Sequence, residues 1–362
     1  MNENEILGFD PSQLNVFNQN DAQKSQGNPL IYRTRPDESV SEDGVYRATI
    51  KVIYNPFNFA QSILEQQSYG LKDANGWFTV ISSLTQNDTS CPIFKAWKKC
   101  HYAEKDSVLW KQAAKLEEGG KALFDKRYSR YVTIQVLSDK NHPEQEGKYL
   151  FWKLPKSIWD VINAKMNPAK ESGKAKIPVM DFLFGRSLDI EVIPGPDDKA
   201  HPERKARETK YRCELSEDVV SCTNPDGSPL LNNEEQNVLD MYVMKLQKIW
   251  REKDPDTRLE LEAALKSDEV SVKLRTIYSR VLGDIKKFCP NLIESLGYKP
   301  WDEKTTARVQ SWIDTVLSGN DPSMTANVPD VLNNVGNETV QDTQDNETLP
   351  MNNTSDDDDL PF

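Results

Sequence analysis

Cationic and aromatic side chains alternate in a short run near the middle of the sequence. Lys and Arg neutralise phosphates, and a base can stack on an aromatic ring in any sequence context. A run of this kind favours binding of single-stranded nucleic acid over binding of a small molecule. Its candidate contact residues are Lys126, Arg127, Tyr128, Arg130 and Tyr131.

Motifs for catalysis are not found in this sequence. Its three histidines, His101, His142 and His201, never occur in H-x-x-x-H spacing, and neither a glycine-rich P-loop nor G-x-S-x-G occurs. The paired acids Glu144 and Glu146 lie in a polar stretch where we expect them to be solvated. The sequence therefore predicts a binding protein rather than an enzyme.

Strands and a helix must position the cationic aromatic run. Residues 131–137 and 148–154 are rich in β-branched and aromatic types and predict two strands joined by a polar loop, and 155–166 predicts a helix. Within 148–154, period-two alternation puts Trp152 on one face and Lys153 on the other. Alternation alone predicts that the Trp152 face is buried.

The flanking sequence predicts further strands and one helix. Residues 46–54 alternate as a first strand, 77–84 follow the Asn75-Gly76 turn as another, and 182–186 with 187–193 predict a strand pair. A helix is expected over 96–118. The basic run 199–212 is expected to form a phosphate-tracking flap beside the sheet, through Lys210, Tyr211 and Arg212.

The remainder of the chain predicts an arm, a helical region and a tail. Residues 1–45 are polar and hold eight acidic and three basic residues, which predicts a partly disordered N-terminal arm. Residues 213–319 have mostly helical periodicity, and their Met and aromatic stripe is typical of a helix core. Residues 320–362 are rich in Asn, Asp and Thr and predict a disordered acidic tail.

Charge is distributed unevenly around a net value of −12. Residues 46–212 hold 28 Lys and Arg against 20 Asp and Glu, whereas 321–362 hold ten acids and no base. A basic middle between acidic ends indicates an anionic partner for the middle. Five widely spaced cysteines argue for a reducing compartment, and the lack of an apolar run of about 18 residues argues against a membrane span.

A resemblance rests on the polar loop and the segments after it. The run Asp139–Lys148 (DKNHPEQEGK), the following strand and Lys156–Ala164 (KSIWDVINA) resemble the core of the T-even phage helix-destabilising proteins. That family binds single-stranded DNA through one OB-fold core. The likeness extends over about 46–211 and includes a turn at Thr89–Pro92. It implies an α+β fold whose OB-fold β-barrel core, 46–212, carries inserted helices.

The resemblance implies additional contact residues and leaves one conflict open. Lys51 lies where the family places a basic residue that contacts DNA, although a lysine on a solvated strand face would equally explain this position. Trp152 matches an exposed tyrosine of the family, which implies base stacking and opposes the buried face that alternation predicts. We favour the stacking position because 126–131 also matches. Lys153 is expected to join the phosphate contacts.

The zinc site of the family does not carry over. Cys91 matches the first Cys of the family's Cys-x-x-Cys pair, but Phe94 replaces the second, Ile81 stands at a third ligand position, and no His precedes His101. Cys100 and His101 offer an alternative set with Cys91. We expect no metal cofactor, and a hydrophobic cluster around Ile81, Cys91 and Phe94 in its place.

The last residues, DDDDLPF at 356–362, resemble the tail tip of bacterial single-stranded DNA-binding proteins, where acidic residues meet basic surfaces and a terminal Phe enters a partner's pocket. This implies partner docking, in contrast to a merely solubilising tail. We also expect the acids to compete with DNA for the basic groove. The docking residues would be Asp356, Asp357, Asp358, Asp359, Leu360, Pro361 and Phe362.

The expected function is that of a single-stranded DNA-binding protein in phage replication, recombination and repair, acting in the cytoplasm of the host cell if the gene is carried by a phage. An RNA-binding module and a replication adaptor that acts through 232–319 and the tail remain alternatives. Self-association on DNA stays open because the arm, 1–45, is acidic where the family's arm is basic.

Overall fold

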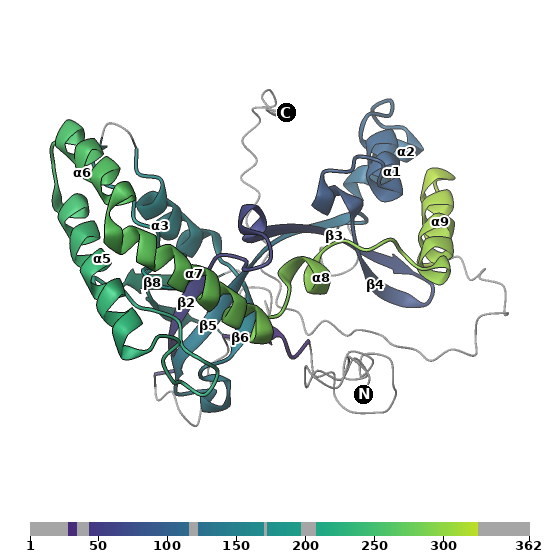
Figure 1. Ribbon diagram of the computed structural model, residues 1–362. Coiled ribbons are helices and arrows are strands. Elements are labelled where there is room, and N and C mark those ends of the chain that lie inside the picture. The colour runs from purple at the N-terminus through teal and green to yellow at the C-terminus, as the bar shows by residue number, and fades with distance from the viewer. Residues whose placement is uncertain (1–27, 35–42, 116–121, 170–171, 197–207, 325–362) are drawn as a thin grey trace, which may run out of the picture.

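One mixed sheet includes strands from both halves of the chain (Figure 1). The computed structural model describes residues 28–34, 43–115, 122–169, 172–196 and 208–324. All neighbouring pairs on the main path are antiparallel except the first. In spatial order the strands are β1 (Ile31–Tyr32), β6 (Tyr149–Lys153), β5 (Asp125–Asp139), β2 (Tyr46–Ile53), β7 (Leu188–Ile193) and β8 (Lys210–Leu215).

The long strand β5 connects the two ends of the molecule (Figure 1). Its second half pairs with β2 and β6, and its first half pairs with β3 (Ile63–Asp73). In the β3 pairing, Ile63 lies opposite Val132 at one end and Gly70 lies opposite Asp125 at the other. We call this first half together with its β3 partners the β3–β5 ribbon. β3 then turns into β4 (Gly76–Ile81) at Gly76, whose φ of +104° suits glycine.

The main core lies on the face of the sheet that alternation predicts. Val132, Ile134 and Val136 of β5 are fully buried, and Trp152 of β6 is only 2% exposed beside them. The helix α3 (Lys156–Met166) closes this core with Ile158 and Ile162. Each such apolar side chain stabilises the fold by about 1.5–3 kcal/mol on burial.

Part of the expected arm belongs to the sheet. β1 adds to the edge of β6, and Tyr32 is 2% exposed. Its hydroxyl donates to Asp139 Oδ2 at 2.9 Å, and the hydroxyl of Tyr46 donates to the same oxygen. Because Asp139 ends β5, this cluster ties β1 and β2 to that end of β5. The rest of the arm, residues 1–27 and 35–42, lies outside the described residues.

Three helices, α5 (Asn233–Arg251), α6 (Pro255–Ser267) and α7 (Glu269–Phe288), form a unit on the face of the sheet that carries Tyr149 of β6 (Figure 1). Leu274, Ile277, Val281 and Ile285 recur at helical spacing on α7 and meet Tyr149 and Phe182. The first helix begins with a capping box between Asn232 and Glu235.

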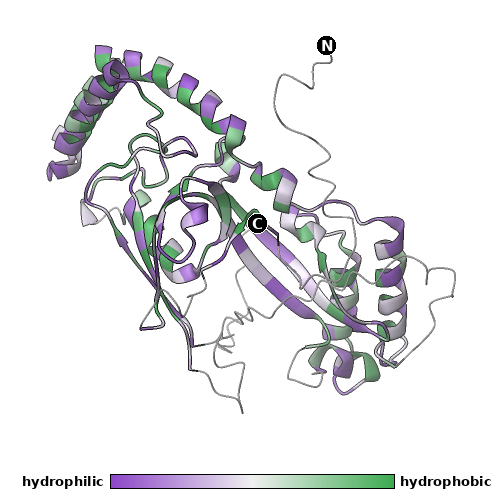
Figure 2. Cartoon of the chain, turned by 90° about the horizontal axis from the view of Figure 1, so that it is seen from below, coloured by the Kyte–Doolittle hydropathy of each residue, from purple (hydrophilic) through white to green (hydrophobic). Residues whose placement is uncertain are grey.

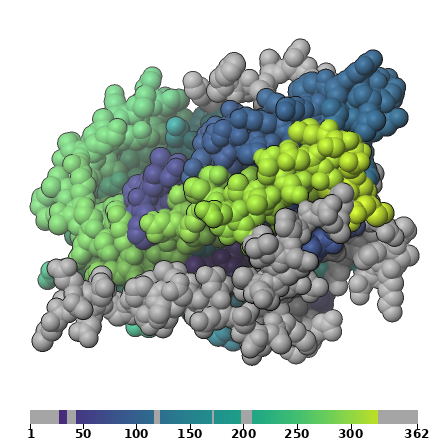
Figure 3. All heavy atoms as spheres, turned by 90° about the vertical axis from the view of Figure 1, so that its right-hand side faces the viewer, coloured from purple at the N-terminus to yellow at the C-terminus, as the bar shows by residue number. Residues whose placement is uncertain are grey.

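The far end of the ribbon is a second packed unit that includes the last described helix. Here α1 (Pro92–His101) and α2 (Val108–Ala114) pack with α9 (Glu303–Leu317), and Trp312 is 2% exposed among them. Figure 3 shows the C-terminal helical segment lying along the earlier elements. Trp312 Nε1 donates to Lys72 O at 2.9 Å, and Arg308 Nε approaches Asp73 Oδ2 at 2.7 Å.

Several sequence predictions for elements need correction. The single helix expected over 96–118 is two helices, because the chain bends at Tyr102–Ser107 with Asp106 at φ +66° and Ser107 capping α2. Residues 182–186 form turns rather than a strand, since Asp181 Oδ1 accepts from the backbone N–H of Leu183 and Phe184. β3 was not predicted, and β8 continues to Leu215, past the expected boundary at 212.

The expected OB-fold barrel stays a prediction. The α+β class is confirmed, but the described pairings end at β1 and β8 without joining these two strands. None of the described helices is long and apolar enough to cross a membrane.

Candidate nucleic-acid interface

One face of the β3–β5 ribbon carries exposed cationic and aromatic side chains. Alternation puts Lys126, Tyr128 and Arg130 on the same face, and Tyr128 is 52% exposed. Figure 2 shows that the long strands of this region are coloured largely hydrophilic. Arg130 Nε lies 2.8 Å from Glu65 Oε1 on the neighbouring strand, so part of its charge is balanced within the protein.

The opposite face of the ribbon is covered. The short helix α8 (Leu292–Leu296) packs Leu292 and Leu296 against Leu64, Phe151 and the partly buried Tyr131. Gln66 Nε2 also donates to Leu296 O at 2.7 Å. A single strand of nucleic acid is therefore expected to bind on the face that carries Tyr128, because α8 occupies the opposite face.

Aromatic rings of α1 continue the surface beside Lys126. The rings of Phe94 and Trp97 stack with centroids 5.8 Å apart and planes at 12°, and Trp97 and His101 stack at 4.7 Å and 17°. Spacings of three and four residues bring these rings to one side of the helix. Lys126 Nζ lies 5.6 Å from the Phe94 ring centroid and 4.7 Å from that of Tyr128. The lysine thus bridges the strand and the helix.

This surface has an excess of unbalanced positive charge. Lys98 Nζ lies 4.6 Å over the Phe94 ring, and Lys95 and Lys99 are exposed on the same helix. Lys95 interacts electrostatically with Asp88, whereas within the described part of the chain no carboxylate forms an ion pair with Lys98, Lys99 or Lys126. Their ammonium groups are therefore available to phosphates without breaking an ion pair. We call Phe94, Trp97, Lys98, His101, Lys126 and Tyr128 the α1–β5 surface.

The structure separates the residues predicted in the cationic run. Arg127 lies on the covered face and its guanidinium is 2.7 Å from Asp125 Oδ2, and Tyr131 packs on α8. Lys153 pairs in register with Tyr131 and so shares that face. Lys126, Tyr128 and Arg130 are brought together on the open face, whereas Arg127, Tyr131 and Lys153 are not among them.

Comparison with known proteins places this architecture in a family. The family model described as "gp32 DNA binding protein like" matches residues 60–241, half of the chain. The chain belongs to this family. The ribbon, α1 and the strands from β3 to β8 lie within the matched range, whereas β1 and β2 precede it. Together with the open cationic aromatic face, the match directs attention to DNA rather than to a small ligand.

Two phage proteins are similar to part of this gp32-like chain. The single-stranded DNA-binding protein of Enterobacteria phage T4 is 28% identical over 126 residues, and that of Enterobacteria phage T2 is 29% identical over the same number. Each alignment covers 34% of this chain and 38% of the relative. The chain thus spans well under half the length of these relatives.

Lys51 and Trp152 are corrections, because this gp32-like chain buries both. Lys51 is 0% exposed and Nζ donates to Val220 O at 2.5 Å, so it reaches no phosphate. Burial lowers its pKa, which the nearby Asp181 opposes. Trp152 lies in the main core, as alternation predicts, and its ring is closed to bases. The other face of β6 is covered as well, since Tyr149 packs on Phe288 of α7.

Lys210, Tyr211 and Arg212 lie at the other end of the sheet. Tyr211 of β8 pairs with Val192 of β7, and Val192 pairs with Tyr46 of β2. Tyr46 lies two residues beyond Ala48, which pairs with Asp139 at the end of β5. Tyr131 and Asp139 are eight residues apart on β5, about 26 Å. Lys210 and Arg212 are exposed, but Tyr211 packs partly against the main core. The remainder of the expected flap, 199–207, and the tail tip, 356–362, lie outside the described residues.

The residues at the family's zinc positions do not fit a metal. Cys91 is 1% exposed in an apolar cluster with Ile93, and Phe94 turns its ring to the α1–β5 surface. Ile81 contributes its carbonyl oxygen to Trp301 Nε1 at 2.8 Å. Cys100 is buried, with its pKa raised by burial. No group of three His, Cys, Asp or Glu stands close enough to hold an ion within the residues that the structure describes.

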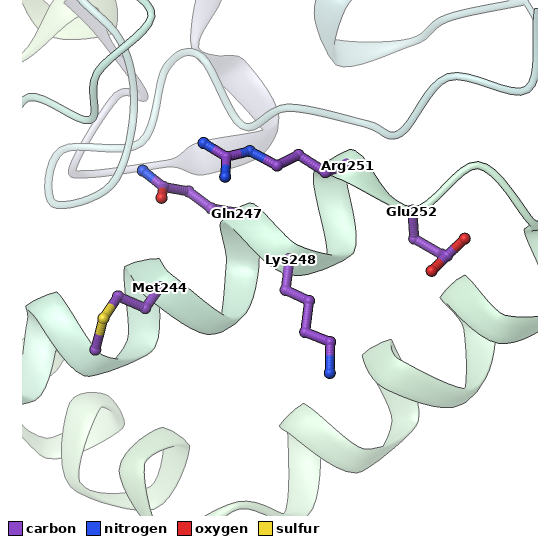
Figure 4. Close-up of a pocket in the computed structure, with 5 residues that line it drawn as sticks. All are labelled: Met244, Gln247, Lys248, Arg251 and Glu252. Atoms are coloured by element: carbon purple, nitrogen blue, oxygen red, sulfur yellow. The ribbon is translucent and has the colours of Figure 1, made fainter.

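A shallow hollow lies away from this surface, on α5 (Figure 4). Met244, Gln247, Lys248, Arg251 and Glu252 line it. In the close-up, Arg251 and Gln247 point away from Lys248, so the polar groups do not converge on one point. Met241 and Met244 are 47% and 64% exposed on the same helix. The hollow lacks the converging polar groups of a typical small-molecule site.

The α1 rings of this gp32-like chain were missed by sequence reasoning. Residues 92–102 (PIFKAWKKCHY) were treated as a zinc remnant and the start of a solvated helix. The signal was the aromatic stripe at positions 94, 97 and 101 among three lysines. At helical spacing this stripe predicts one aromatic, cationic side of a helix, which is the arrangement that the structure shows.

Proposed function

We propose that this chain is a single-stranded DNA-binding protein that coats and protects unpaired DNA during phage replication, recombination and repair in the cytoplasm of the host. The observation that carries the proposal is Lys126 bridging the rings of Phe94 and Tyr128 on the open face of the ribbon. The family match and the names of the two phage relatives support it.

In this proposal bases stack on Tyr128 and on the α1 rings, while the lysines neutralise phosphates. Stacking contributes about 1–3 kcal/mol per base and accepts every base, because each has a π face. The ribbon reads no sequence, since none of its contacts requires a base edge. A protein that prefers unpaired strands shifts the equilibrium away from hairpins and so melts them.

Fluorescence titration with a homopolymer oligonucleotide tests the proposal. Trp97 lies in the α1–β5 surface and is expected to be quenched by single strands, with little response to the matching duplex. Logarithmic affinity should fall with logarithmic salt by about 0.7 per phosphate contact. Absence of binding at low salt by a chain lacking residues 325–362 would contradict the proposal.

RNA binding is the second candidate on the same surface. Stacking and phosphate contacts do not by themselves distinguish ribose from deoxyribose. The same titration with a ribose oligonucleotide of equal length decides between them. Tighter binding of the ribose strand would assign the surface to RNA.

We further propose that the acidic tail regulates the surface and recruits replication proteins. Residues 325–362 hold nine acidic residues and no Lys or Arg, opposite in sign to the exposed lysines of α1. The tail would occupy the lysines when DNA is absent and free Phe362 for a partner when DNA binds. The exposed Met241 and Met244 on α5 offer an adaptable apolar surface for partner contact.

A further inference from the structure

Two phenylalanines are exposed on the loop that connects β2 to β3. Phe57 is 40% exposed and Phe59 is 45% exposed. Burial of large apolar rings away from water stabilises proteins, so rings left exposed can gain by contact with a ligand. Two such rings on one loop are available to a ligand.

The loop is held in one conformation by its own polar groups. Asn55 is 0% exposed, and its Oδ1 accepts from Phe57 N at 3.1 Å. Ser62 Oγ donates to Phe59 O at 2.7 Å, and Asn58 Oδ1 accepts from Ala60 N at 3.1 Å. The rings are thus presented outward by a rigid turn, and little conformational entropy is lost when a ligand meets them.

A cation and a third aromatic ring stand beside the two phenylalanines. Lys286, exposed near the end of α7, places Nζ 5.9 Å from the Phe57 ring centroid. The Tyr54 ring lies 5.9 Å from that of Phe59. Lys286 makes no ion pair with any residue that the structure describes. The loop therefore repeats the pairing of rings with an unbalanced ammonium that marks the α1–β5 surface.

The loop lies at the end of the ribbon opposite to α1. It enters β3 at Ile63, which pairs with Val132, whereas Lys126 pairs with Tyr69 at the other end. These positions on β3 are six residues apart, about 20 Å. Tyr128, paired with Gln67, lies between them. Aromatic rings therefore occur at both ends and in the middle of the ribbon.

We propose that Phe57 and Phe59 form a second base-stacking platform, with Lys286 as its phosphate contact, so that a single strand runs along the ribbon from the α1 rings past Tyr128 to this loop. The proposal rests on single-stranded DNA binding as the function and defines the extent of the site. A strand long enough to reach both ends gains contacts that a short strand lacks.

Anisotropy titration of the full chain with labelled oligothymidylates of about 6 and about 16 nucleotides tests this, since OB-type sites take about 4–16. The variant is Phe57→Ala/Phe59→Ala, and Leu259→Ala on α6, 64% exposed, is the matched control. The double variant should bind the longer strand about tenfold more weakly and the shorter strand as the wild type does. Thermal unfolding should not change.

The charge is tested with two lysines of the same helix. Lys286→Ala should lower the salt slope for the longer strand by about 0.7, while Lys273→Ala, whose ammonium pairs with Glu269, should leave it unchanged. Equal affinity of the double variant and the wild type for the longer strand, or equal losses on both strands, would overturn the platform. Failure of the wild type to bind either strand would instead refute the proposed function.

Discussion

At the scale of single residues, exposure separates two aromatic side chains that the sequence treated alike. Tyr128→Ala should weaken single-strand binding by about 1–3 kcal/mol without changing stability, because its ring is 52% exposed. Trp152→Ala should instead destabilise the fold by about 3–5 kcal/mol, because its ring fills the main core. Urea unfolding and anisotropy titration on both variants measure this. Weaker binding by a stably folded Trp152→Ala protein would restore the stacking assignment.

The buried Lys51 gives a prediction for pH. Burial lowers its pKa in the folded chain, so the unfolded chain binds more protons between that value and the ordinary lysine pKa. Stability should therefore rise with pH through that window in the wild type, and not in Lys51→Met. Urea unfolding at neutral and alkaline pH measures the difference. Lys51→Met should also keep its affinity for DNA, whereas the exposed Lys126→Ala should lose affinity.

At the scale of elements, the sequence predicted the strands with strong alternation and the helices with strong periodicity. β2, β6 and α3 are confirmed within a few residues, and α5, α6, α7, α8 and α9 lie in the region expected to be helical. β3 was missed because its segment, ILEQQSYGLKD, has polar residues on both faces, and the helices that cover it, α1, α8 and α9, come from distant parts of the chain. Of the α1–β5 surface, the sequence predicted the β5 residues and missed the α1 rings. The contact of Lys126 with Phe94 joins segments that are distant in the sequence, so no local pattern indicates it.

Helix α9 stabilises the end of β3 through contacts that the sequence does not predict. Its Trp312 and Arg308 hold β3 at Lys72 and Asp73, beside the apolar cluster that contains Cys91. Trp312→Ala should destabilise this unit by about 3–5 kcal/mol, and Ser311→Ala on the solvent side of the helix should not. Urea unfolding and hydrogen exchange in β4 measure the effect.

The same unit should be indifferent to chelators. Because apolar packing and α9 hold it together, treatment with EDTA should change neither its unfolding midpoint nor the affinity for DNA. Stoichiometric zinc in the purified protein, with a lower unfolding midpoint after its removal, would contradict the replacement of the metal.

At the scale of the whole molecule, the charge of the tail opposes that of the α1–β5 surface. Residues 325–362 are 38 residues, which reach at most about 125 Å when extended. That reach exceeds the length of the ribbon, so the acids can meet the α1 lysines within one chain. Deletion should begin at residue 325, because Asp321 Oδ2 lies 2.5 Å from Lys115 Nζ and belongs to the folded part.

Deletion of 325–362 should strengthen binding of single strands at low salt and make the salt slope steeper. In the full chain, DNA must displace the acids before it gains the lysines, so fewer counterions are released per DNA bound. The affinities of the two proteins should converge as salt screens the tail, since the Debye length is about 10 Å at 0.1 M. Anisotropy titrations across salt measure both curves.

A tail of equal length with its nine acids changed to Asn and Gln separates charge from bulk. If charge causes the competition, this neutral tail should behave as the deletion does, whereas a tail that blocks by its size would leave the variant like the wild type. Identical curves for all three proteins would rule out competition. Such a result would leave partner docking through Phe362 intact, because docking requires an accessible tip and no contact with the ribbon.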